Sequence, residues 1–196
     1  MFQLTPVVKN LIIINVLFFA GSYLVLGEER YILGLFPPNS EQFAPYQLIT
    51  HMFMHSDFTH ILFNMFVLAV FGPMVEQTVG PQRMLILYFA CGLGALLLHF
   101  GMQYVMTGWG GFVWGASGAT MGISAAFATW YPQRQLMLLF PPIPVKAWIL
   151  VSVLLAIDLF SGFGNPGSGI AHFAHVGGAL VGVALTLVWK GAFSRR

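Results

Sequence analysis

A serine lies between glycines at the start of a short apolar segment, in the sequence Gly-Ala-Ser-Gly of residues 115–118. Small residues are common where membrane helices pack together, so this motif alone indicates no chemistry. A second apolar segment downstream contains His175, followed by Gly178 and Gly182. A serine hydroxyl becomes a nucleophile when a base takes its proton, and histidine is suited to that role near neutral pH. Ser117 and His175 are therefore a candidate pair for acyl transfer.

Acyl transfer also needs hydrogen-bond donors for the charge that develops on the substrate's carbonyl oxygen. His60 and Asn64 are four residues apart, so they share one helix face, and both side chains can donate. The Ser117 backbone N–H is a third candidate donor. Each feature alone has a structural alternative, such as an interhelical bond for Asn64. Strongly polar groups are costly in lipid, however, and their joint occurrence in apolar segments indicates a functional site.

Membrane spans are the elements that position these residues. Of the 196 residues, 58% are hydrophobic and 7% are charged, and the mean hydropathy is +0.81. A helix crosses the hydrocarbon core of a bilayer with about 20 apolar residues. The sequence predicts an all-α membrane protein, with residues 1–196 forming a single six-span domain and residues 28–57 a long first external loop. The predicted spans are residues 10–27, 58–78, 83–104, 116–131, 146–161 and 170–189.

Basic residues orient these spans. One side of the membrane receives both termini and seven of the eight Lys and Arg residues, which are Lys9, Arg83, Arg134, Lys146, Lys190, Arg195 and Arg196. Loops rich in Lys and Arg remain in the cytoplasm, so both termini are predicted to be cytoplasmic. Glu76 is expected to be a solvated charge on this side. The net charge of +2 reflects this orientation and gives no reason to expect a nucleic acid partner.

The fourth predicted span is short. Its sixteen residues rise ~24 Å as a helix, against a hydrocarbon core of about 30 Å. Ser117 is therefore expected below the outer surface, beneath a glycine-rich dip at residues 105–115. The second and sixth spans run in the same direction, and His60, Asn64 and His175 fall in their first two turns. All four residues are predicted at a similar depth.

These motifs resemble the rhomboid family of intramembrane serine proteases. The resemblance rests on Gly-x-Ser-Gly at 115–118, His-x-x-Gly-x-x-x-Gly at 175–182 and His60-x-x-x-Asn64, with two histidines ahead of His60. It implies a rhomboid-like bundle and a Ser117–His175 catalytic dyad. It also implies an oxyanion hole formed by His60, Asn64 and the Ser117 amide, and cleavage of transmembrane substrates near their extracytoplasmic end. No cofactor is expected.

The chain departs from the family pattern at two places. In many members a tyrosine four residues after the serine stacks on the catalytic histidine. This chain has Met121 at that position, so His175 is expected to be held more loosely. Tyr46-Gln47 replaces a Trp-Arg pair of the first external loop, which puts the anchoring of that loop in doubt.

The remaining polar residues have expected structural roles. Asp158, near the outer end of the fifth span, is expected to cap a helix or pair locally rather than act as a third catalytic residue. His172 is an alternative base, but only His175 precedes the glycine register. His51 and His55 have ligand-compatible spacing without a His-Glu-x-x-His motif, so hydrogen bonding in the external loop is expected and no metal is.

The expected partners are the lipid bilayer and single-span or multi-span membrane protein substrates; the sequence specifies no oligomeric state. A substrate span with small or helix-disrupting residues near its external end is expected. Entry is predicted past the fifth span and a cap at 161–169, with Trp148, Phe163 and Gly167 as gate or cap residues; loosening this gate by Trp148→Ala should raise or preserve cleavage. We expect the membrane to be bacterial and cytoplasmic, because no transit-like leader or appended domain is evident.

Two other classes of function compete with a protease. A catalytically silent rhomboid-like protein would bind membrane clients, but it needs neither Ser117 nor His175. A small transporter or a carrier of a histidine-ligated cofactor would also place polar groups inside a bundle. The clustering of these groups at one depth, with no comparable path toward the cytoplasm, argues against that class.

Overall fold

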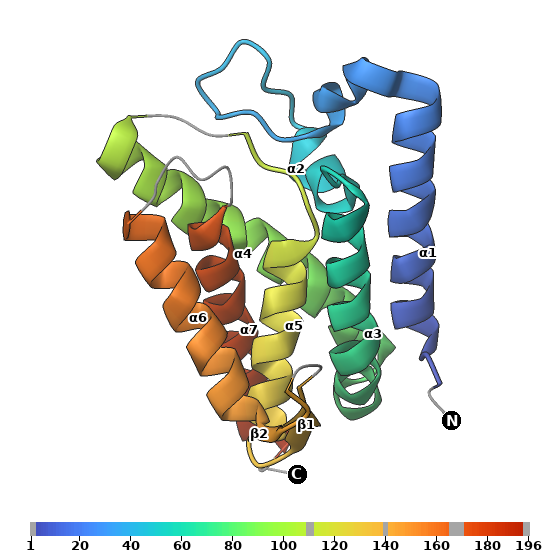
Figure 1. Ribbon diagram of the computed structural model, residues 1–196, viewed down its shortest axis with the longest axis vertical. Helices are drawn as coiled ribbons and strands as arrows, with labels where there is room; N and C mark the ends of the chain where they lie inside the picture. Colours follow the sequence, from blue (N-terminus) through green and yellow to red (C-terminus); the bar gives the residue numbers. More distant parts are fainter. Residues whose placement is uncertain (1–2, 109–111, 139–140, 165–170, 194–196) are drawn as a thin grey trace.

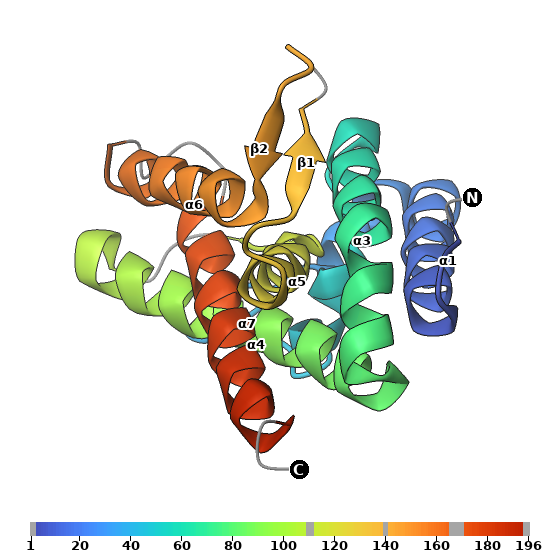
Figure 2. The same ribbon diagram turned by 90° about the horizontal axis from the view of Figure 1, so that it is seen from below.

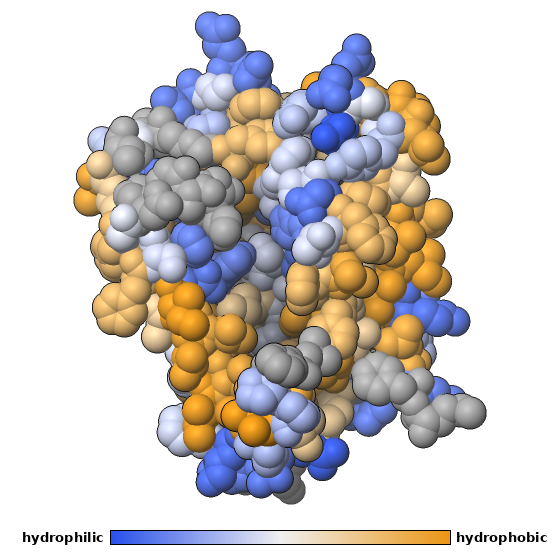
Figure 3. Space-filling view, in the orientation of Figure 1, coloured by the Kyte–Doolittle hydropathy of each residue, from blue (hydrophilic) through white to orange (hydrophobic). Residues whose placement is uncertain are grey.

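A computed structural model describes residues 3–108, 112–138, 141–164 and 171–193. They form a helical bundle in which both ends of the chain lie at the same end of the molecule, as the charge pattern predicts (Figure 1). The helices are α1 (Pro6–Gly21), α2 (Gln47–Thr50), α3 (Phe58–Val79), α4 (Pro81–Thr107), α5 (Ser117–Trp130), α6 (Ala147–Gly164) and α7 (His172–Phe193). In Figure 3, hydrophobic residues dominate the flanks of the bundle and hydrophilic residues gather at its two ends.

The expected all-α membrane bundle is confirmed. The described part of the chain has five helices long and apolar enough to cross a membrane, which are α1 with the turns that follow it, α3, α4, α6 and α7. The fourth predicted span is α5, which has 14 residues and rises ~21 Å. A sixth crossing therefore depends on a helix shorter than the hydrocarbon core, surrounded by other helices.

The first predicted span, residues 10–27, differs from the observed helix. α1 begins four residues earlier, at Pro6, and is followed by a π-helical turn at Ser22–Leu26 and a 3-10 turn at Gly27–Leu33. Pro6 suits the first position of a helix, because its missing N–H would have no partner there. Glu28 and Glu29 thus lie in the first turn of the 3-10 segment, beyond the α-helical part of the span.

Glu76 fixes this early start, and the expectation that it is solvated is wrong. The Glu76 carboxylate is 4% exposed and accepts hydrogen bonds from the backbone N–H groups of Val7 at 3.1 Å and Val8 at 3.0 Å, and from the Thr5 hydroxyl. The first N–H groups of a helix have no partner within the helix. A carboxylate from α3 supplies those partners and complements the positive end of the α1 dipole.

α4 extends beyond its predicted ends. Gly80, with φ +86°, makes the turn from α3, and Pro81 begins the helix. The 27 residues of α4 rise about 40 Å, which exceeds the hydrocarbon thickness of about 30 Å. A helix of this length accommodates the difference by tilting, and Figure 1 shows α4 inclined to α3 and α5.

α5 lies at the centre of the bundle, with α3, α4, α6 and α7 packed around it (Figure 2). Ten of its fourteen residues are buried. A Cβ at Gly178 would overlap the carbonyl oxygen of Gly118, and one at Gly182 would overlap that of Gly122. The predicted small-residue faces therefore allow the backbones of α5 and α7 to touch. This contact sets the position of the first turn of α5 relative to α7.

Hydrogen bonds tie the external loop to the segment that enters α5. Leu35 and Val113 exchange two backbone bonds of 2.8 and 2.9 Å. Gln47, 1% exposed, donates to the carbonyls of Ile32 and Gln42 and accepts from two backbone N–H groups. Gln47 therefore anchors the loop in which the Trp-Arg pair is missing.

One element was not expected. Two short strands, β1 (Gln135–Met137) and β2 (Pro144–Lys146), form an antiparallel hairpin between α5 and α6. It lies at the end of the bundle that holds the chain termini (Figure 1), far from the start of α5.

Candidate active site

Ser117 is the first residue of α5, where a sharp backbone turn delivers it. Gly115 has φ +121°, in the region that favours glycine, and its N–H donates to the carbonyl of His51 at 2.8 Å. Ala116 occupies the N-cap position and offers no side-chain cap to α5. The first N–H groups of α5 are thus left for another acceptor, and the positive end of the helix dipole lies beside the Ser117 hydroxyl.

His60 reaches the same place from the first turn of α3. Asp57 caps α3 by accepting from the His60 N–H at 2.9 Å. The His60 Nδ1 is 3.4 Å from the Ser56 N–H, which can only donate, and 3.0 Å from the Ser56 hydroxyl. Nδ1 is therefore the acceptor of the neutral ring, and Nε2 carries the proton. A Cβ on Gly115 would lie 2.8 Å from that Nε2 and 3.7 Å from the Ser117 Oγ, so the missing side chain leaves space between these two groups.

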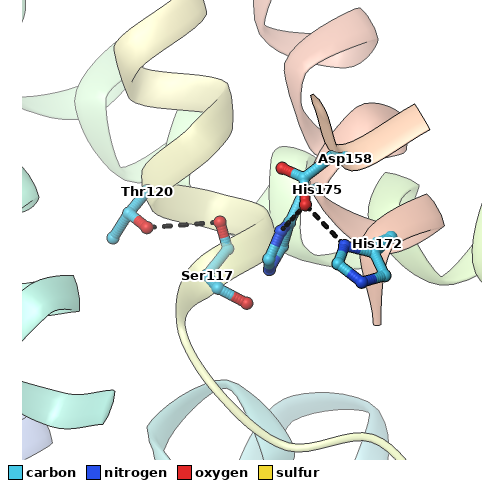
Figure 4. A network of polar contacts seen from close by, with 5 residues as sticks. All are labelled: Ser117, Thr120, Asp158, His172 and His175. Carbon is cyan, nitrogen blue, oxygen red and sulfur yellow. Dashed lines mark hydrogen bonds and ion pairs between the residues drawn. The ribbon is translucent and has the colours of Figure 1, made fainter. Parts of the chain in front are cut away.

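Asn64 joins α3 to α5 and is 5% exposed. Its Nδ2 donates to the His60 carbonyl at 2.9 Å, and its Oδ1 accepts from the Thr120 hydroxyl at 3.0 Å. One Nδ2 hydrogen remains for a further acceptor. Thr120 also approaches the Ser117 carbonyl at 3.2 Å, a contact drawn in Figure 4. Sequence reasoning missed Thr120, although its position three residues after Ser117 places it on the same helix face.

His175 lies on the other side of Ser117, in the first turn of α7. Its Nδ1 is 3.1 Å from Asp158 Oδ1, and the Nδ1 of His172 is 2.7 Å from the same oxygen. In Figure 4 the His175 ring lies between Ser117 and His172, and both rings are bonded to Asp158. Among the described residues, no hydrogen bond joins His175 to Ser117. Asp158 does pair, as expected, but it pairs across to α7 and with the candidate base itself.

The side chains of Asp158, His172 and His175 are of the types that bind metal ions, and their ligand atoms lie within 4.8 Å of one another. In a tetrahedral zinc site the ligand atoms are about 3.3 Å or more apart, given zinc–ligand distances of roughly 2.0–2.2 Å. The separations from Asp158 Oδ1 are 2.7 and 3.1 Å. These are hydrogen-bond distances, so the cluster is a hydrogen-bonded network.

His51 and His55 lie in the external loop beside the site. His51 Nδ1 bonds the Gln47 carbonyl at 2.8 Å, as expected for a structural histidine. His55 differs, because neither ring nitrogen has a partner among the described residues, and its ring packs edge-on against His60 at 5.0 Å. Burial lowers the pKa of His51 to about 4 and, aided by His60, the pKa of His55 to about 3.

These two shifts predict that the folded protein loses stability in mild acid. The unfolded chain binds protons at both rings below about pH 6.5, whereas the folded protein binds them only near pH 4 and pH 3. The free energy of unfolding is therefore at its full value above pH 6.5. It should fall as the pH drops from 6.5 toward 4, by up to about 1.4 kcal/mol per pH unit for each histidine. Melting temperatures in detergent between pH 7.5 and 4.5 should show this slope. His55→Phe should make it shallower, and an unchanged slope would contradict the assignment to His55.

The expected gate residues do not lie together. Trp148 is the second residue of α6, ten residues and about 15 Å of helix rise from Asp158, at the end of α6 remote from Ser117. Phe163 lies at the outer end of α6, 54% exposed, with its ring 5.3 Å from that of Phe173. Gly167 lies outside the described residues. Of the two gate residues that the structure describes, Phe163 is the one at the end of the bundle where Ser117 lies.

A small cavity adjoins Ser117. Its lining includes the polar ring of His51 and apolar side chains from α4, α7 and the residues just before α5 and α7, which are Leu96, Val113, Ala171 and Ala174. Cys91 is buried and lies against Gly122 instead, consistent with packing. The site as a whole combines a serine, two flanking histidines and a helix N-terminus inside a membrane bundle.

The fold and the site together define the class of this protein, a multi-pass membrane protein with a serine and histidine site at the start of its central helix. Comparison with known families assigns the chain to one of them. The Rhomboid domain family model matches residues 42–191. The chain belongs to the rhomboid family and is an integral, multi-pass membrane protein.

Similar proteins come from a plant, an animal and a bacterium. "RHOMBOID-like protein 12, mitochondrial" of Arabidopsis thaliana is 32% identical over 206 residues, which cover 95% of this chain and 60% of that protein. "Presenilin-associated rhomboid-like protein A, mitochondrial" of Danio rerio is 28% identical, with 83% and 44% covered. "Rhomboid protease AarA" of Providencia stuartii is 30% identical, with 70% and 53% covered. The chain thus spans about half the length of these relatives. Because two of them are named mitochondrial, they do not support the expected bacterial cytoplasmic membrane.

Proposed function

We propose that this protein is an intramembrane serine endopeptidase that cleaves transmembrane substrates near their extracytoplasmic end. The observation that carries the proposal is the placement of Ser117, with the Nε2 of His60 across the Gly115 gap on one side and the ring of His175 on the other. A client-binding protein or a transporter needs no activated serine. The name of one relative, a rhomboid protease, supports the same activity.

The proposed reaction is acyl transfer through Ser117. Oγ attacks the carbonyl carbon of the scissile bond while its proton passes to His175 Nε2. The carbonyl oxygen becomes an oxyanion and accepts hydrogen bonds from His60 Nε2–H, the Ser117 N–H and the free Nδ2 hydrogen of Asn64. The C–N bond then breaks as His175 gives its proton to the leaving amine. Water, deprotonated by His175, hydrolyses the acyl-enzyme and restores the Ser117 hydroxyl.

Loss of a side-chain donor should slow turnover without abolishing it. His60→Ala and Asn64→Ala each leave the Ser117 amide and the other donor, so we expect kcat to fall about 10²- to 10³-fold. KM should change little, because these bonds strengthen in the transition state. Asn64→Ala should also lower the melting temperature, since it removes the link to Thr120. Steady-state cleavage of a reporter span in liposomes measures both constants, and a change confined to KM would make these residues substrate-binding groups.

The substrate must unwind before it can be cut. A peptide bond inside a regular helix has its carbonyl in an intrahelical hydrogen bond and its backbone shielded by side chains. The cavity beside Ser117 is small and lined by residues such as Ala171 and Ala174, which favours a small side chain next to the scissile bond. The predicted substrates are therefore membrane spans with small or helix-disrupting residues near the external end, entering past α6.

Leucine substitution in the substrate tests this requirement. Replacing glycine or proline near the scissile bond by leucine should suppress cleavage in liposomes, because the local helix is stabilised. A matched reporter with the same substitution ten residues further into the membrane should be cut normally. Equal rates for the stiffened and native reporters would contradict the unwinding requirement, and faster cleavage of soluble peptides than of embedded spans would contradict lateral entry.

Labelling with an active-site reagent distinguishes a protease from a client-binding protein that has no catalytic activity. A fluorophosphonate labels a serine only when a base activates it. Selective labelling of Ser117 in purified protein, lost in His175→Ala, is the expected result. An unlabelled but folded protein that still binds membrane spans would support the client binder.

A further inference from the structure

One carboxylate oxygen, at the outer end of α6, is bonded to two histidines at the start of α7. Asp158 Oδ1 lies 2.7 Å from His172 Nδ1 and 3.1 Å from His175 Nδ1, and the Asp158 side chain is 13% exposed. The two rings are nearly perpendicular, at 81°, with centroids 6.4 Å apart. They therefore approach the oxygen from different directions.

The chemistry of this oxygen determines where the hydrogens are. An ionised carboxylate only accepts, so each Nδ1 must carry a hydrogen and donate it. A neutral His175 with a proton on Nδ1 has its lone pair on Nε2. Nε2 is the ring nitrogen that is not bonded to Asp158, and the ring lies between Ser117 and His172 (Figure 4). The bond to Asp158 thus selects the tautomer that can accept the serine proton, and it fixes the plane of the ring.

The same bond matters again when His175 becomes charged. A protonated imidazole at membrane depth is costly unless an opposite charge lies near it. Asp158 is the only acidic side chain bonded to either histidine in the described part of the chain. His172 holds the carboxylate from the other side, so Asp158 need not turn away when His175 moves its proton.

We propose that Asp158 is a positioning residue of the catalytic base, with His172 as the donor that holds its carboxylate in place. This inference rests on the proposed protease function and adds to it a third, acidic member that acts through His175 without touching the substrate. A role in stability alone would affect folding but would leave the tautomer of His175 and the kcat of the folded enzyme unaltered.

Asp158→Asn in the full chain tests the proposal. The amide nearly preserves shape, but it can present an N–H to His175 and so allow the wrong tautomer. In liposomes we expect kcat to fall about 10²- to 10⁴-fold, the upper value being typical when the aspartate of a soluble serine protease triad is replaced by asparagine. KM should stay within about twofold, because the substrate does not contact Asp158. His172→Gln, which keeps a donor for the carboxylate, should lose less, and Ser152→Ala on an exposed position of α6 should behave as wild type.

Nitrogen NMR of the wild-type protein with labelled histidine gives an independent readout. Neutral His175 should carry its proton on Nδ1, and in Asp158→Asn this preference should weaken. Proton on Nε2 in the wild type would overturn the proposal, even if the variant fails to fold. A folded Asp158→Asn with cleavage within threefold of wild type would also overturn it. Absence of cleavage by the wild type is a different result, which counts against the protease itself.

Discussion

Ser117→Ala and His175→Ala are each expected to abolish cleavage of an embedded reporter span, with a fall in kcat on the order of the 10⁶-fold loss known for the nucleophile or base of a soluble serine protease. Each change removes one half of a proton-transfer pair. Neither removes much core volume, so the purified variants should keep the wild-type melting temperature to within a few degrees. The double variant should be no less active than either single variant, because the pair acts as a unit.

A matched control is available on the same helix. Ser124 is buried on α5 and its hydroxyl bonds the Thr120 carbonyl at 2.9 Å, two turns below Ser117. Ser124→Ala should cleave at nearly the wild-type rate. Near-wild-type cleavage by Ser117→Ala or His175→Ala would mean that another pair performs the reaction, and His172 would then be the base to test first.

The spacing of polar residues in apolar segments predicts much of this site. His60 and Asn64 are on one face of α3 because they are four residues apart, and the glycine pairs at 118/122 and 178/182 predict the close contact of α5 with α7. These are local regularities of a helix. They determine which faces meet, and the order and direction of the spans then place the site at the end of the bundle opposite the chain termini.

Contacts between distant side chains were not predictable in the same way. Asp158 is 17 residues from His175, on another helix, and the expected local pairing could not specify the partner. Glu76 bonds the N-terminus of α1 across 69 residues of sequence, and its position near a span end does not reveal that partner. Trp148, expected to be a gate residue, lies at the end of α6 remote from Ser117. In each case the direction of one side chain in space decides the role, and sequence spacing within one helix does not contain that direction.

A substitution in the loop that enters α5 is expected to have the second large effect on cleavage. Gly115 has φ +121°, and a Cβ there would lie 2.8 Å from both Nε2 and Cε1 of His60, closer than atoms normally approach. Gly115→Ala should therefore push the His60 ring away and fill the space beside the Ser117 Oγ, where the carbonyl of the substrate is proposed to bind. The loss should equal or exceed that of one oxyanion donor, about 10²- to 10³-fold in kcat, with weaker substrate binding in addition.

Alanine substitutions at two other glycines are controls that distinguish the two possible effects of Gly115→Ala, which are filling of the space beside Ser117 and strain in the backbone. Gly80 has φ +86° with open space around it, and Gly101 lies in α4 with open space and no positive φ. Gly80→Ala should lower the melting temperature, since alanine is strained at this φ and ψ by roughly 1–3 kcal/mol, yet leave the cleavage rate of the folded enzyme unchanged. Gly101→Ala should leave the cleavage rate unchanged and should not lower the melting temperature, since alanine favours a helix more than glycine does. If Gly115→Ala loses only stability, as Gly80→Ala does, and still cleaves at the wild-type rate, then the space between His60 and Ser117 does not receive the substrate. The oxyanion hole would in that case have to be assigned to other donors at the start of α5.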